Sequence, residues 1–586
     1  MTTVEVAEAP SRRLRVPWSG GVLWVILGLL IVAPVLSFLL LATSPRLFGQ
    51  GRELFTLRYV SQALSGVTGQ GVFNSLWVSL VVAVTSVTMA TTLAWLIQRT
   101  NIYGRRLWPM LMWLLFLVPT WMMTLSWVDV LQPYGSASAL GLSTRWLYGE
   151  FLGPFGIIVV LTIASLPFAY FVVSAGLLGL GSEYEDAARI HGAGRAGTLR
   201  TVLPMVAPAL LSAFAISFAE TMSDFGVPFT LAYHSHFPMA TYTLFASISN
   251  YPANFSVAAV IALVLILTTI PPIVLQARVT RRRSYAIISG RAREVRRREF
   301  SRLARVVVSA SVALVFVIGL GVPIAGAVLG SFMRNLGIFS SGPLHLSSVY
   351  YHQVFAPSIV GKGLSAPLLL SNQIALVAAT ATAALAFVFA RRLMSRSAGW
   401  SQRLTDVLLV GSVAVPGVVL GVGYVFFYNL SFITNHVINL YKTLPLLVLA
   451  LVATSLPGQT RFLAGPVSQI QPSLSEAARV HGAPRWRAWR TTTLPLISRV
   501  MLWGWLLTFA KTIAELPISQ ILYPPSQEPL SVTIQAYLGN FQLGTGTAMT
   551  VVGLVEIFGV IFVALGLYRV VTPRGWQRIG WSGVGA

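Results

Sequence analysis

The chain contains no cysteine and few charged residues, and both absences narrow its chemistry. Without cysteine, its 586 residues can form no disulfide, thiolate metal site or cysteine nucleophile. Charged residues make up 10% of the sequence, whereas soluble globular proteins have about 25%. With 55% hydrophobic residues and a mean hydropathy of +0.74, this composition excludes an ordinary soluble domain.

A phosphate-binding loop of the Gly-x-x-x-x-Gly-Lys-Ser/Thr type is also missing. The chain has only three lysines, and the one that precedes a threonine, Lys511, lies in an apolar run without glycine before it. No nucleophile elbow or paired acid–base motif is visible. The sequence therefore predicts that this chain is not an enzyme and binds no cofactor.

The formal net charge of +24 does not indicate a nucleic-acid-binding protein, because the arginines cluster at the ends of apolar runs. Arginine in short loops holds those loops on the cytoplasmic side of a membrane. Eleven arginines lie between Arg278 and Arg305 alone. We expect no nucleic-acid partner and a multi-pass protein of the bacterial cytoplasmic membrane with both termini inside.

Twelve apolar windows approach the roughly 20 residues that a helix needs to cross a membrane. The sequence predicts an all-α polytopic fold in which they form two parallel sets of six. The expected spans are 20–43, 73–97, 107–131, 155–178, 207–230 and 254–277, followed by 304–331, 370–390, 404–428, 444–464, 497–520 and 548–568. The domains would be a tail (1–19), a first repeat (20–277), an Arg-rich linker (278–303), a second repeat (304–568) and a tail (569–586).

Two similar stretches about 290 residues apart support this duplication. Asp186-Ala187-Ala188 with Gly192 matches Glu476-Ala477-Ala478 with Gly482, and each is followed by a basic segment that ends in Leu-Pro. Both fall in predicted cytoplasmic loops, at about 183–204 and 474–495. Val118-Pro119 and Val415-Pro416 break the third span of each half in the same way. Parallel repeats of this kind usually place the substrate path between the halves.

The residue types in these stretches suit a docking element. Two alanines let a short helix seat closely on a partner, an acidic residue can cap or pair near the turn, and glycine permits a left-handed turn. The alternative is an ordinary amphipathic helix with its stop signal.

The second stretch, Glu476-Ala477-Ala478-x-x-x-Gly482 followed by Thr492-x-Leu494-Pro495, resembles the cytoplasmic loop signature of permease subunits of ATP-binding-cassette importers. The resemblance implies a fold of the type I importer kind and a coupling helix for each of two ATPase subunits, which would bind ATP and Mg²⁺. It also implies an extracytoplasmic binding protein that delivers the ligand. The first stretch departs from the pattern, since Asp186 replaces Glu and the interval to Leu203-Pro204 is one residue shorter.

Charged residues inside predicted spans are costly and usually functional. Glu220 and Asp224 lie four residues apart on one helix face, and their repeat counterparts are Lys511 and Glu515. We expect Asp224 and Glu515 to form an acidic lining for a cation, and Glu220 and Lys511 to form an ion pair between the repeats. The alternative is that all four are structural. Asp129 is a weaker candidate because its repeat counterpart is Phe426.

The sequence indicates the class of transporter more clearly than it indicates the substrate. Asp224-Phe225-Gly226, Glu515-Leu516-Pro517 and Arg281-Arg282-Arg283-Ser284-Tyr285 resemble fused ferric iron permeases, which favours iron, while thiamine, polyamine and aminoethylphosphonate permeases remain alternatives. His234-x-His236, in a predicted external loop, suggests metal handling only weakly. A secondary transporter of twelve spans has the same outline and needs no ATPase. A membrane scaffold would leave the charges inside the spans unexplained.

Overall fold

The computed structural model describes residues 20–180, 183–192, 194–232, 237–282, 297–334, 336, 345–357, 363–394, 400–470 and 472–572. These residues form helices joined by short connections, and no β-strand occurs among them. Ten helices are long and apolar enough to cross a membrane, and one bent pair adds an eleventh span. The prediction of an all-α polytopic membrane protein is confirmed. His234 and His236 lie outside the described residues.

The membrane-spanning elements follow the same order in both halves. In the first half they are α1 (Gly20–Leu27) with η1 (Gly28–Val32) and α2 (Ala33–Leu40), α4 (Gly66–Arg99), α5 (Leu107–Leu117) with α6 (Thr120–Leu131), α9 (Pro154–Leu178), α11 (Arg195–Ser223) and α14 (Phe255–Arg282). In the second half the equivalent elements are α15 (Arg302–Phe316) with η3 (Val317–Gly321) and α16 (Val322–Phe332), α18 (Ser365–Leu393), α19 (Trp400–Ser412) with α20 (Gly417–Tyr428), α22 (Leu444–Ser468), α25 (Leu494–Ile513) and α28 (Leu543–Val571). The pair α19 with α20 is not among the eleven candidate spans, since α20 is a shorter apolar helix.

Short helices join these spans. They are η2 (Pro45–Phe48), α3 (Arg58–Ala63), α7 (Ser136–Ala139), α8 (Arg145–Phe151), α10 (Glu183–Ile190), α12 (Gly226–Ala232), α13 (Ala240–Ser249), α17 (Val349–Phe355), α21 (Ser431–His436), α23 (Pro472–Val480), α24 (Arg485–Ala488), η4 (Trp489–Thr493), α26 (Pro517–Leu522) and α27 (Leu530–Gly539).

Proline accounts for the breaks that both halves share. Helix α5 and the segment Thr120–Ala139, which begins with α6, meet at 96° where Pro119 has an extended backbone. Pro416 has nearly the same backbone angles before α20. Proline cannot donate a backbone hydrogen bond and pushes the residue before it out of the helical region. The predicted breaks in the two third spans are therefore present. Wide helical turns of the π type, η1 and η3, likewise precede Pro34 and Pro323 in the two first spans.

The first span of each half packs against the third span of the other half. Helix α2 contacts α20, and α16 contacts α6. Glycine makes both contacts close: a Cβ on Gly423 would lie 2.4 Å from the carbonyl oxygen of Pro34, and one on Gly326 would lie 2.0 Å from Val130 Cγ2. This exchange ties the two halves into one bundle.

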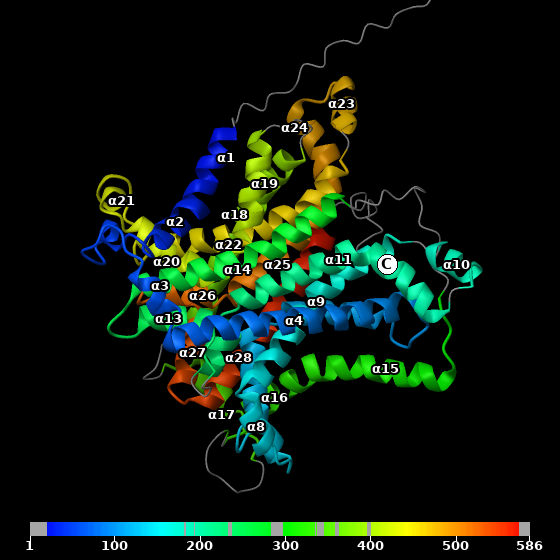
Figure 1. Cartoon of the computed structure of the whole chain (residues 1–586), viewed down its shortest axis with the longest axis horizontal. Helices are drawn as coiled ribbons and strands as arrows, with labels where there is room; N and C mark the ends of the chain where they lie inside the picture. Colours follow the sequence, from blue (N-terminus) through cyan, green and yellow to red (C-terminus); the bar gives the residue numbers. More distant parts are fainter. Residues whose placement is uncertain are drawn as a thin grey trace, which may run out of the picture.

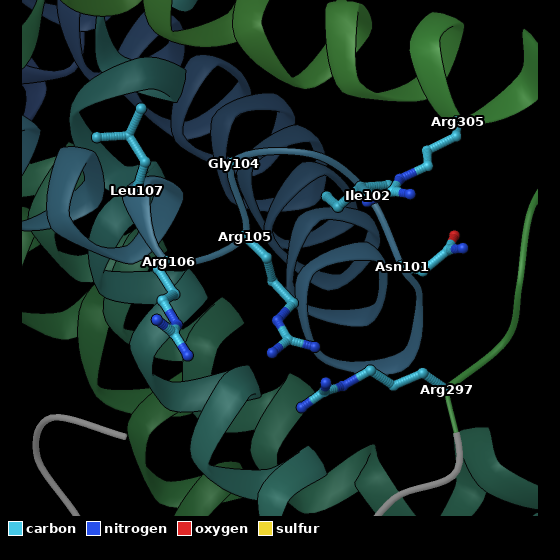
Figure 2. A pocket seen from close by; sticks show the side chains of 8 residues that line it. All are labelled: Asn101, Ile102, Gly104, Arg105, Arg106, Leu107, Arg297 and Arg305. Carbon is cyan, nitrogen blue, oxygen red and sulfur yellow. The ribbon is translucent and has the colours of Figure 1, made fainter. Parts of the chain in front are cut away.

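The chain enters the second half beside a loop of the first half. The amide of Arg298 donates to the carbonyl of Arg99 over 2.8 Å, and the amide of Phe300 donates to Asn101 Oδ1 over 3.1 Å. Deeper along α15, Ser309 Oγ accepts from the amide of Tyr103 at 2.9 Å. Figure 2 shows that arginines from both segments gather around the pocket between them.

The long helices form the centre of the molecule, and the short helices lie at its ends (Figure 1). Helix α23 projects at the top of the picture and α10 at its right, each beyond the end of the long helix that follows it. Helices α3 and α21 lie at the left of the picture, and α8 and α17 lie at the bottom. The two predicted docking elements therefore share one side of the bundle.

Candidate functional site: docking helices and central gate

The two docking segments fold alike. Each is a short helix that ends in a left-handed glycine, with φ of +76° at Gly192 and +82° at Gly482. An added Cβ would meet nothing within 4 Å at either glycine, so the backbone conformation alone requires glycine there. In both copies the histidine before the glycine returns to the helix: His191 and His481 place Nδ1 2.8 Å from the carbonyls of Ala187 and Ala477.

Each docking helix leaves a large apolar side chain uncovered at the same position. Ile190 is 83% exposed and Val480 is 84% exposed. Around the second helix, Leu474 and Trp486 are also exposed, and Trp486 stacks on Trp489 with ring centroids 5.1 Å apart. Single exposed apolar side chains are common on protein surfaces, so what distinguishes Ile190 and Val480 is that they recur at equivalent positions of the two repeats.

The two connections to the following span differ by one residue, and the structure shows where the extra residue goes. From Gly482 to Leu494 the chain contains the wide turn η4, whereas the first copy continues as one α-helix from Arg195. A π-type turn accommodates one residue more than an α-helical turn. The second copy also carries the tryptophan pair, which the first copy lacks. The two docking elements are therefore alike in fold and unlike in surface.

At the far end of these spans, Asp224 and Glu515 cap the short helices α12 and α26. Asp224 Oδ1 accepts from the amide of Val227 at 2.9 Å, and Oδ2 accepts from the hydroxyl of Thr120 at 2.9 Å. Glu515 accepts from the amides of Ile518 at 2.7 Å and Ser519 at 2.9 Å. A carboxylate that satisfies free amides in a first helical turn acts as an N-terminal cap.

The same frame of hydrogen bonds surrounds both caps. Thr241 donates to the carbonyl of Asp224 over 2.7 Å, and Ser531 donates to the carbonyl of Glu515 over 2.6 Å. The hydroxyls of Ser75 and Ser371 then each accept a backbone amide at the start of α13 or α27, at 2.8 Å. The duplication therefore extends to individual hydrogen bonds.

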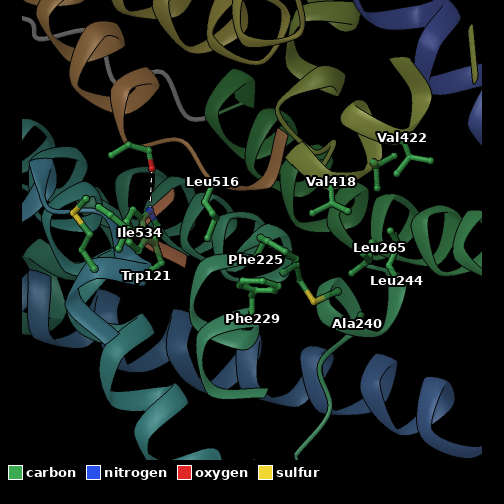
Figure 3. Close-up of a cluster of buried hydrophobic side chains, with 14 of the residues drawn as sticks. Trp121, Phe225, Phe229, Ala240, Leu244, Leu265, Val418, Val422, Leu516 and Ile534 are labelled. Carbon is green, nitrogen blue, oxygen red and sulfur yellow. Dashed lines mark hydrogen bonds between the residues drawn. The ribbon is translucent and has the colours of Figure 1, made fainter. Parts of the chain in front are cut away.

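Between the caps, buried apolar side chains from both halves close the centre of the bundle, as Figure 3 shows. The rings of Phe225 and Phe229 stack at 4.8 Å, and Leu516 and Val418 come from the other half. Trp121 Nε1 donates to the carbonyl of Ala514 over 2.9 Å, which joins α6 directly to the end of α25. We call this cluster, with Trp121, the central gate.

Glu220 and Lys511 lie below the gate and behave differently from the caps. Both side chains are exposed, although their neighbours Ala219 and Ala510 are buried. Their charges interact, but these two described residues form no direct ion pair. Lys511 Nζ instead lies 4.9 Å from the centre of the Phe116 ring. The predicted direct pair is replaced by attraction over a longer distance.

Asp129, the weaker candidate, connects the halves rather than facing a path. It is buried in α6, where Oδ2 accepts from the hydroxyl of Thr547 at 2.6 Å and Oδ1 accepts from Gln132 Nε2 at 3.3 Å. Thr547 belongs to α28, so this contact crosses between the repeats. No group of three His, Asp or Glu residues within the described ranges is arranged to hold a metal ion.

Two fused repeats of membrane spans, each with a short helix before its fifth span, define a polytopic membrane protein built by internal duplication. The chain belongs to the family described as "Binding-protein-dependent transport system inner membrane component", whose pattern matches residues 84–285 and 382–576. It is therefore a permease of binding-protein-dependent ATP-binding-cassette importers, and its resemblance to them is confirmed. The two matches follow the duplication.

Several curated proteins are similar to the chain. Fe(3+)-transport system permease protein FbpB 2 of Haemophilus influenzae is 22% identical over 91% of this chain and 95% of its own length. Probable ABC transporter permease protein y4fN of Sinorhizobium fredii is 26% identical over 68% of this chain and 70% of its own length. Sulfate transport system permease protein CysT of Salmonella typhimurium is 31% identical over 32% of this chain and 70% of its own length.

Proposed function

We propose that this chain forms the path by which ferric iron, delivered by an extracytoplasmic binding protein, crosses the cytoplasmic membrane. Two ATPase subunits would dock on α10 and α23 from the cytoplasm and supply the energy. The observation that carries this proposal is the matched pair of docking helices with Ile190 and Val480 uncovered on one side of the bundle. Because the sequence has no phosphate-binding loop, ATP would be hydrolysed on those partners.

The structure offers a direct mechanical route from each docking helix to the gate. Helix α11 has 29 residues, which corresponds to about 43 Å, and it ends at the cap residue Asp224. In the second half, η4 and α25 lead from α24 to Glu515 in the same way. When the ATPases close on ATP and bring α10 and α23 together, both caps would move with their short helices. The central gate would open outward, and hydrolysis would return it.

Similarity favours iron over the alternatives. The relative named for Fe(3+) transport aligns along nearly the whole chain, whereas the relative named for sulfate aligns with about a third of it. A hard trivalent cation prefers oxygen ligands. Since Asp224 and Glu515 already use their oxygens as caps, we infer that Glu220, which is exposed one helical turn before Asp224, is the carboxylate that a passing cation meets first.

Uptake by proteoliposomes that contain the chain, its ATPase and its binding protein tests this proposal. Ferric iron, sulfate, thiamine and putrescine would be compared side by side, with and without ATP. We expect ATP-dependent uptake of iron alone. Uptake of another substrate would refute the choice of iron, and uptake without any ATPase subunit would favour a secondary transporter. A Glu220→Gln variant that transports iron normally would remove this carboxylate from the path.

A further inference from the structure

Four of the eight residues that line the pocket in Figure 2 are arginines, and none of the eight is acidic. The pocket is walled by the loop after α4 and the segment that enters α15, and it has a volume of about 530 Å³. Arg105 and Arg106 come from the loop, and Arg297 and Arg305 come from the other segment. Arg105 and Arg297 point toward one another in Figure 2.

These guanidinium groups repel one another. Partial burial and the charges of Arg297 and Arg106 lower the pKa of Arg105, and no carboxylate offsets them. Arg305 has a buried Nε without a hydrogen-bond partner in the described part of the chain. A buried donor left unpaired costs about 1–3 kcal/mol, so a hydrogen-bond acceptor beside Arg305 would be stabilising. An anion would remove both penalties.

The pocket is built on a fixed frame. Gly104 turns the loop with φ of +68°, where a Cβ would lie 2.9 Å from the indole of Trp108. Trp108 Nε1 donates to the carbonyl of Tyr103 over 2.8 Å, and its ring stacks on Phe316 at 5.5 Å. The guanidinium of Arg305 lies 3.8 Å from the centre of the Tyr103 ring. The arginines are therefore presented by aromatic packing between the halves rather than by a free loop.

The pocket lies at the end of the bundle that bears the docking helices. Arg99, just before it, donates to the carbonyls of Leu177 and Leu180 at the end of α9, directly before α10. The proposed function places this end in the cytoplasm. Basic pockets between membrane helices on that side suit the phosphate groups of anionic lipids.

We propose that this arginine pocket binds a phosphate-bearing anion, either the headgroup of an anionic phospholipid or free phosphate. The anion would bridge Arg105 of the first half and Arg297 of the second half. It would thereby hold the start of the second half against the loop of the first. Guanidinium groups form paired, charge-assisted hydrogen bonds with phosphate oxygens, which fits four arginines around one pocket.

Titration of the purified full chain in detergent tests the site without requiring transport. Native mass spectrometry would follow the binding of short-chain phosphatidylglycerol, phosphatidylcholine and inorganic phosphate in separate arms. We expect saturable binding of one equivalent of phosphatidylglycerol or of phosphate, but not of phosphatidylcholine. The arm that saturates identifies the source. If neither anion binds, the proposal is wrong, whether or not the chain transports iron.

Substitutions of the pocket arginines test whether the anion binds there. At about 1 kcal/mol for each arginine, R105Q/R297Q should raise Kd about thirtyfold, and R106Q alone should raise it about fivefold. The matched control R391Q/R403Q removes the same charge from exposed positions of the second half and should leave Kd unchanged. An unchanged Kd in both pocket variants, or an equal loss in the control, would overturn the proposal. If R105Q/R297Q fails to fold, R106Q decides the question.

Discussion

The one-residue difference between the two docking connections predicts opposite outcomes for two single-residue deletions. Removing a residue from an α-helix turns everything before it by about 100° and shifts it by about 1.5 Å. Deletion of Gly197 in α11 should therefore rotate α10 about the helix axis, while deletion of Thr491 in η4 should convert a wide turn into a regular one. The second deletion makes the interval from Gly482 to Leu494-Pro495 equal to that of the first copy.

The size of the expected displacement follows from helix geometry. For a helix about 10–12 Å across, a turn of 100° moves a surface group by about 8 Å, and the projecting α10 would move farther. Ile190, which is 83% exposed, would then face away from its partner. Deletion of Thr491 removes an exposed residue and leaves both flanks in helical register, so Val480 should keep its place.

Proteoliposomes that contain the complex provide the assay. ATP hydrolysis stimulated by the loaded binding protein, and substrate imported per ATP, would be measured for both deletions after size-exclusion chromatography confirms assembly. We expect deletion of Gly197 to abolish import and deletion of Thr491 to retain at least half of it. Equal loss in both variants, or loss with Thr491 alone, would refute the role assigned to η4.

Three further substitutions test the gate and the docking turn. Because Asn and Ser cap helices about as well as Asp, the variants Asp224→Asn and Asp224→Ser should retain import, whereas Asp224→Ala should lower the free energy of unfolding by about 1–2 kcal/mol in denaturant titrations. Loss of import in all three variants would favour an acidic lining. Gly482→Val places a branched residue in a left-handed turn at a cost of about 1–2 kcal/mol, so ATP hydrolysis should become uncoupled from import. Normal coupling in this variant would exclude the turn from the mechanism. Trp121→Phe removes the hydrogen bond to Ala514, which is worth about 1 kcal/mol, and should raise the rate of ATP hydrolysis in the absence of binding protein. An unchanged basal rate would show that the gate does not depend on this hydrogen bond.

Features that depend on local sequence could be predicted. Proline predicted the breaks at Pro119 and Pro416 because it cannot continue a helix, and the glycines at 192 and 482 predicted left-handed turns. The repeated docking motif could be found because both copies keep the same spacing. The unequal intervals were visible as well, although only the structure shows that a wide turn absorbs the difference.

Features that depend on tertiary contacts could not be predicted. Nothing in the apolar first spans indicates that each packs on the other half, since hydropathy carries no information about partners. The caps had a usable signal: Asp224 precedes Gly226 by two residues and Glu515 precedes Pro517 by two, as at many helix starts. This helix-start signal is easily missed because Asp224 and Glu515 lie inside long apolar segments. The bond from Trp121 to Ala514 joins residues 393 apart and has no local signature.

Because the chain contains no cysteine, single cysteines can report directly whether α10 and α23 meet the ATPases. Ile190→Cys, Val480→Cys and the double variant would be crosslinked in assembled complexes, with Leu140→Cys, an exposed residue of the first half outside the docking helices, as control. We predict one ATPase subunit attached to each single variant, two to the double variant and none to the control. Crosslinks from the control with none from Ile190→Cys or Val480→Cys would contradict the account.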